Sequence, residues 1–125
     1  MHMRRSSFES DTYITSTSTS PFGPFGDFQV SNVTDSTWAG GDFHLFIDAA
    51  DGNAGYIIWT AMSAQPGFDH KIKIQRLTAD FRNAAPNSAP YMFAEQFNEA
   101  PMLIERAGVY YALFGRTYLR ACTRG

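Results

Sequence analysis

Two carboxylic acids, Asp42 and Glu99, each head an apolar segment that is followed by a glycine-containing turn and an aromatic segment. Glycoside hydrolysis needs one acid to protonate the leaving oxygen and a carboxylate base to activate water, roughly 6.5–9.5 Å apart in inverting enzymes. A second carboxylate nearby keeps the first protonated near neutral pH, because like charges resist ionising together. Neighbouring aromatic rings would offer stacking faces to sugars. Each acid also has a simpler interpretation as a turn or loop residue.

Other chemistries find less support in the sequence. The segment "DAADGN" resembles a calcium loop, but Ala50 stands where an oxygen ligand is needed and no glutamate closes the loop. The histidines, at 2, 44 and 70, lack metal-ligand spacing, and Cys122 is the single cysteine. A Gly-x-Ser-x-Gly nucleophile turn is absent. We therefore expect no metal and no cofactor.

Length and composition are typical of one globular domain or of part of a larger one. The 125 residues are 44% hydrophobic and 15% aromatic, with 18% charged residues and a net charge of −2. This balance does not favour a nucleic-acid partner. The first ten residues show no secretory leader, and no segment reaches the roughly 18 apolar residues of a membrane helix. We expect neither a nucleic-acid nor a membrane partner.

Hydrophobic patterning predicts an all-β chain. Residues 43–47 alternate, "DAADGNAG" supplies a hairpin turn, and "GYIIWTA" is apolar on both faces, as in a covered inner strand. In "HKIKIQRL" the two isoleucines are expected to point inward, with Lys71, Lys73 and Gln75 on a solvent-exposed face. Residues 82–98 are predicted to be a loop. The unit of acid, apolar strand, glycine turn and aromatic strand thus occurs twice, which suits radially repeated sheets or a sandwich.

These segments resemble glycoside hydrolase family 43, whose members are five-bladed β-propellers. "GDFHLFIDAADGNAGYIIWTA" is similar to the third blade, with Asp42, Asp48, Asp51 and Gly52 at the matching places. "KIKIQRLTADF" resembles the continuation of that blade, "NEAPMLIERAGVYYALFG" the start of the fourth, and "YITSTSTSPFGPF" the end of the second. The likeness covers 12–115 and is strongest to the exo-β-1,3-galactanase-like branch. It implies antiparallel four-stranded blades, about two to three of them, between a disordered 1–11 and an irregular tail over 116–125.

The resemblance also implies roles for single residues. Glu99 would be the general acid and Asp42 the acid that tunes its pKa and orients it, while Asp48 and Asp51 keep their turn roles. From their positions in the sequence, Trp38, His44 and Trp59 are the candidate substrate-binding residues. Both tryptophans are by default core residues, and Trp38, just before Asp42, is the better candidate for stacking on a sugar. The expected activity is inverting hydrolysis of galactan, arabinan or xylan. An extracellular location is expected from the family.

Departures from the family pattern matter as well. The general base of the family is an aspartate of the first blade, which the resemblance does not reach, so we expect a truncated and weak or inactive enzyme. Incomplete propellers leave apolar faces and strand edges uncovered, which predicts self-association. One alternative is a non-catalytic carbohydrate-binding β domain that uses Trp59, Tyr110 and Tyr111. Another is a structural β domain in which the acids serve only as turn residues.

Overall fold

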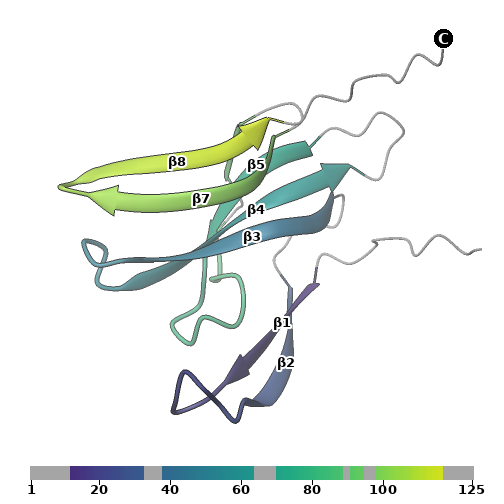
Figure 1. Cartoon of the computed structure of the whole chain (residues 1–125), viewed down its shortest axis with the longest axis vertical. Coiled ribbons are helices and arrows are strands. Elements are labelled where there is room, and N and C mark those ends of the chain that lie inside the picture. The colour runs from purple at the N-terminus through teal and green to yellow at the C-terminus, as the bar shows by residue number, and fades with distance from the viewer. Residues whose placement is uncertain (1–11, 33–37, 64–69, 89–90, 95–97, 117–125) are drawn as a thin grey trace, which may run out of the picture.

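The computed structural model describes residues 12–32, 38–63, 70–88, 91–94 and 98–116, and these form eight β-strands without a helix (Figure 1). The predicted all-β class is therefore confirmed. The predicted disordered segment 1–11 lies outside the described residues, as does the predicted tail except for Arg116, the last residue of a strand. Within the described part of the chain, no helix has the length and apolar character to cross a membrane.

A four-stranded antiparallel sheet forms the centre of the molecule. Its strands follow chain order: β3 (Trp38–Asp48), β4 (Ala54–Ser63), β5 (His70–Arg76) and β6 (Tyr91–Ala94). The strand β6 corrects the prediction that 82–98 is entirely a loop. Four residues are too few for alternation to reveal a strand, and only pairing with β5 (Ile74 opposite Tyr91) defines this one.

Two hairpins pack on opposite faces of this sheet (Figure 1). The hairpin of β1 (Thr12–Thr17) and β2 (Gly26–Asn32) places Tyr13 against a core of Ile57, Trp59, Ala61 and Leu77. The hairpin of β7 (Asn98–Arg106) and β8 (Val109–Arg116) places Leu103 against Ile58 and Ile72 on the other face. The strand β4 is therefore covered on both sides, as its sequence predicts.

The prediction that Lys73 and Gln75 lie on a solvent-exposed face of β5 is wrong. Lys73 is 4% exposed and Gln75 is 2% exposed. The chain that follows β5 folds back over this face, where the Gln75 side-chain amide donates to the carbonyl of Ser88 at 2.8 Å. Alternation reveals which residues share a face of a strand, but it does not reveal what covers that face.

The outer faces of the two hairpins are apolar and exposed. On β1 and β2 these residues are Ile14, Phe28 and Val30, which are 64–73% exposed. On β7 and β8 they are Met102, Ile104, Tyr111 and Leu113. Soluble monomers rarely leave large contiguous apolar patches open to water, and such patches mark contact surfaces.

Candidate functional site

Both predicted acids lie at irregularities of their strands. The β3–β4 register shifts between Gly40 and Phe43, which places Asp42 within a β-bulge. The β7–β8 register shifts between Glu99 and Met102, and Ala100 has a positive φ of 52°. A β-bulge redirects the side chains beside it and is common next to active sites, and positive φ is unusual for alanine. Each acid therefore departs from the regular alternation of its strand.

Contacts along β7 fix its alignment on the central sheet. Glu99 contacts His70 at the start of β5, and the backbone N–H of Leu103 donates to His44 Nδ1 on β3 at 3.4 Å. Further along, Tyr110 of β8 reaches Asp48 at the end of β3. In the sheet, β5 runs parallel to β3, and Tyr110 lies opposite Glu105 of β7. The three contacts therefore follow the same order along β3 and β7, so these two strands run in the same direction and begin at the same end of the molecule.

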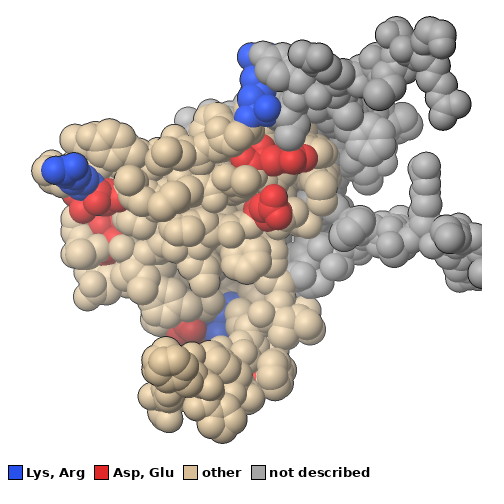
Figure 2. Space-filling view, in the orientation of Figure 1, with Lys and Arg blue, Asp and Glu red and all other residues tan. Residues whose placement is uncertain are grey.

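The two acids therefore share that end. Figure 1 shows β3 and β7 both starting on the right, and Figure 2 shows acidic side chains gathered over this region. Asp42 is exposed and Glu99 is half-buried. The pair thus occupies an accessible rim where the central sheet meets the β7–β8 hairpin.

The immediate partner of Glu99 is a histidine for which the sequence suggested no role. Nδ1 of His70 lies 2.5 Å from Oε1 of Glu99, with 16% and 35% of the respective side chains exposed. His70 opens β5 opposite Met62 of β4. Its contact with a residue 29 positions later depends on how β7 crosses the sheet, which no local pattern in the sequence reveals.

His44 holds the strand that carries Glu99. Its Nδ1 accepts the Leu103 N–H, so in the neutral ring the proton resides on Nε2. The imidazole is half-buried between β3 and β7. His44 therefore has a positioning role at the candidate site, whereas contact with a substrate remains a prediction.

Of the two tryptophans predicted to bind substrate, only Trp59 has a described side chain. Trp38 is the first residue of β3, the strand that also contains Asp42, but the Trp38 side chain is not described. Trp59 is 2% exposed and packs in the core that faces the β1–β2 hairpin, opposite the face that receives β7. Trp59 is therefore a core residue, and the prediction that it binds substrate is wrong because its ring has no free face.

Asp48 and Asp51 have the turn roles expected of them. Asp48 Oδ1 accepts hydrogen bonds from the backbone N–H groups of Ala50 (2.9 Å) and Asp51 (3.3 Å). Gly52 and Asn53 have φ values of 61° and 63°, as the two central residues of a type I′ turn require, and the Ala54 N–H closes it on the Asp51 carbonyl at 3.0 Å.

Asp48 also links the turn to the β7–β8 hairpin. The Tyr110 hydroxyl donates to Asp48 Oδ2 at 2.7 Å. This hydrogen bond lowers the pKa of Asp48 and raises the pKa of Tyr110 to about 12, because it stabilises the carboxylate and the protonated phenol. The Tyr110 ring also packs edge-on against Phe46 at a centroid distance of 6.1 Å. Tyr110 thus serves to dock the hairpin, and its hydroxyl is engaged within the protein.

Among the described residues, no three histidine, cysteine, aspartate or glutamate side chains come together as a metal site. Comparison of the chain with known protein families, with curated protein sequences and with solved structures gives no match. The resemblance to family 43 therefore rests on the residues quoted from the sequence.

Proposed function

We propose that the chain is part of an inverting glycoside hydrolase of the family 43 type that acts on galactan, arabinan or xylan. Glu99 is the general acid, and Asp42 is the second carboxylate that tunes and orients it. The observation that supports this assignment is that both acids lie at β-bulges at the same end of two packed strands, β3 and β7. If Asp42 and Glu99 were only turn residues, nothing would require both of them to lie at β-bulges at the same end of the two strands.

The architecture agrees with the proposed propeller fragment. A four-stranded antiparallel meander with a hairpin packed on each face is what one blade and parts of its two neighbours would form. The exposed apolar faces of the outer hairpins are then the surfaces that further blades would cover. We propose that, when these blades are absent, copies of the chain associate through those faces.

In the proposed reaction, Glu99 transfers its proton to the glycosidic oxygen while the bond from that oxygen to the anomeric carbon breaks. A nucleophile attacks the anomeric carbon from the opposite face of the sugar, which inverts its configuration. His70 and the β7 strand, held by His44, fix the position of the Glu99 carboxyl group. In the family the base that activates water belongs to the first blade, which the resemblance does not reach.

The experiment supplies the missing nucleophile from outside. Sodium azide can attack the anomeric carbon without a base, and the products are a glycosyl azide of inverted configuration and the free alcohol. We expect the chain to convert phenyl galactoside, xyloside or arabinoside in the presence of azide. Glu99→Gln should abolish this reaction but retain conversion of dinitrophenyl glycosides, whose leaving group needs no proton.

Controls separate the possible outcomes. Glu105→Gln, a change of an exposed acid at the far end of β7, should leave the rate unchanged. Equal rates for the wild type and Glu99→Gln on phenyl glycosides would refute the role of Glu99. Absence of turnover, together with sugar binding that survives the Asp42→Asn and Glu99→Gln changes, would instead support the non-catalytic carbohydrate-binding domain.

A further inference from the structure

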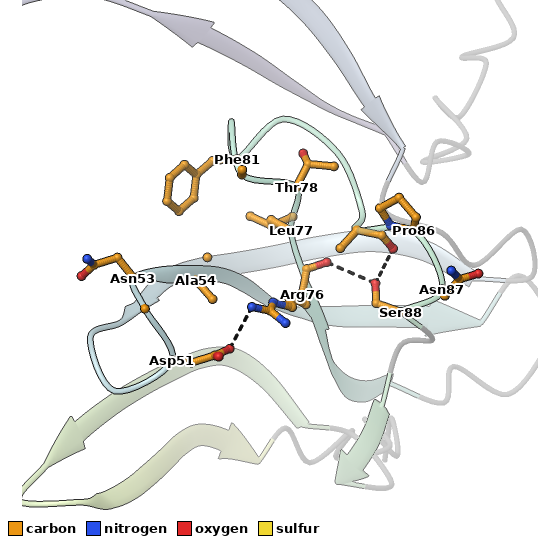
Figure 3. A pocket seen from close by; sticks show the side chains of 14 residues that line it. Asp51, Asn53, Ala54, Arg76, Leu77, Thr78, Phe81, Pro86, Asn87 and Ser88 are labelled. Atoms are coloured by element: carbon orange, nitrogen blue, oxygen red, sulfur yellow. Dashed lines mark hydrogen bonds and ion pairs between the residues drawn. The ribbon is translucent and has the colours of Figure 1, made fainter.

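A second concave site lies at the other end of the central sheet, beyond the β3–β4 turn and away from the two acids. It is a pocket of about 640 Å³ formed by the 51–55 turn, the end of β5 and the 77–88 segment (Figure 3). This volume is in the range of ordinary small-molecule sites. None of its residues takes part in the proposed reaction.

An aromatic ring is held in this pocket by an unusual backbone. Phe81 has a φ of 62°, which is a rare conformation for a residue with a bulky side chain, and the residue is 37% exposed. Its N–H donates to the Thr78 carbonyl at 2.8 Å, and its ring lies over Gly55, where a Cβ atom would overlap it. Such backbone strain is concentrated at binding sites, where the surrounding structure maintains it.

The polar groups of the pocket balance each other in charge. Asp51 and Arg76 are the charged residues among those that line it, and they form an ion pair at 3.2 Å. The Asp51 carboxylate also accepts the Tyr56 hydroxyl at 2.7 Å. A charged ligand would therefore find neither an unpaired cation nor an unpaired anion, which argues against phosphates, carboxylates and amines.

The remaining polar lining suits hydroxyl groups. Asn53 and Asn87 each present an amide that both donates and accepts hydrogen bonds, and both have φ values near 60°. In the view of Figure 3, Asn53 and Phe81 lie at one end of the pocket, while Pro86, Asn87 and Ser88 lie at the other. The site thus combines flat apolar surfaces with separated two-way hydrogen-bonding groups, a combination that matches a neutral sugar with apolar ring faces and hydroxyl edges.

We infer that this pocket binds a neutral saccharide, about two sugar units long, with one ring stacked on Phe81. The inference goes beyond the proposed hydrolase activity, since it depends on none of the residues assigned to the reaction. It gives the chain a second point of attachment to a polysaccharide, separate from the rim that carries Asp42 and Glu99.

The test is a titration of the isotope-labelled full chain with xylobiose and with β-1,3-galactobiose, followed by the backbone amide resonances of 51–55 and 77–88. We expect these amides to shift with at least one disaccharide. Phe81→Asn removes the ring and retains a residue that tolerates positive φ, and it should raise the Kd about tenfold or more. Asn53→Gly keeps the turn but removes one amide, and it should weaken binding several-fold.

Matched variants decide between explanations. Phe22→Asn makes the same chemical change at a residue that is 97% exposed and outside the pocket, and it should show the same shifts at 51–55 and 77–88 as the wild type. Glu99→Gln should also keep the shifts at these amides, because Glu99 is not among the residues that line the pocket. With the disaccharides, either of two results would overturn the inference: absence of shifts at the solubility limit of both disaccharides, or binding lost in Glu99→Gln but kept in Phe81→Asn. The second result would place the sugar at the acids and support the proposed function instead. Stronger binding of phosphate or glucuronate at these amides would also overturn it.

Discussion

Replacement of Leu103 by alanine tests whether the β7–β8 hairpin is held on the central sheet as described. Leu103 is 8% exposed and contacts Ile58 and Ile72, which are fully buried. The change removes three carbons, worth about 0.8 kcal/mol each, or about 2.4 kcal/mol together, and leaves a cavity that adds to the cost. We expect the free energy of unfolding to fall by about 3 kcal/mol. For a domain of this size that is a large fraction of the total stability.

The assay is urea unfolding followed by circular dichroism, with amide hydrogen exchange as a local measurement. Exchange should accelerate more in β7 and β8 than in β1 and β2, because Leu103 anchors one hairpin and not the other. Ile104→Ala is the matched control, since the neighbouring side chain is 39% exposed on the outer face, and it should cost less than about 1 kcal/mol. Equal losses in the two variants would refute the packing of this hairpin through Leu103, and with it the shared end of the two acids.

Three further results are expected. Tyr110→Phe should lower stability relative to the wild type by an amount that is constant between about pH 4 and pH 10. This difference should vanish as the pH rises through about 12, because the raised pKa of Tyr110 means that the folded state holds the phenol proton more tightly, and it should also shrink in acid as Asp48 is protonated. Parallel unfolding midpoints from about pH 4 to 12 would contradict the bond to Asp48. Gly55→Ala should cost about 1–3 kcal/mol in thermal or urea unfolding, because the added methyl group overlaps the ring of Phe81; an unchanged midpoint would show that the ring does not rest there. Leu113→Lys, on the exposed outer face of β8, should reduce concentration-dependent association in sedimentation velocity, and an unchanged profile would exclude that face as the contact.

Local patterns predict most of the described strands. The alternation in β3 and β5, the two-sided apolar run of β4 and the turn residues Gly52 and Asn53 all act over a few positions, so that the sequence is sufficient to identify them. The short strand β6 and the burial of Lys73 depend on what packs against them. Pairing with β5 defines β6, and the chain that follows β5 covers the face that carries Lys73.

The same distinction between local pattern and long-range packing applies to the candidate site. Asp42 and Glu99 are found from sequence because each is an acid that precedes an apolar run, although β3 itself begins earlier, at Trp38. The β-bulges that surround them follow from strand register, and the contact of Glu99 with His70 follows from the packing of two sheets. The pocket around Phe81 escapes prediction because a phenylalanine gives no sequence signal for positive φ, unlike a glycine or an asparagine.

The double engagement of Asp48 has a consequence for the order of assembly. One oxygen accepts from residues two and three positions ahead, whereas the other accepts from Tyr110, 62 positions away. Closing a short loop costs less entropy than closing a long one, so the tight turn should be in place first and present the carboxylate to the later hairpin. Substitutions at Asp48 would then slow the docking of β7 and β8 on the sheet as well as weaken the turn. A change at the Asp48 end of the sheet would therefore also disturb β7, the strand that carries Glu99 at the other end.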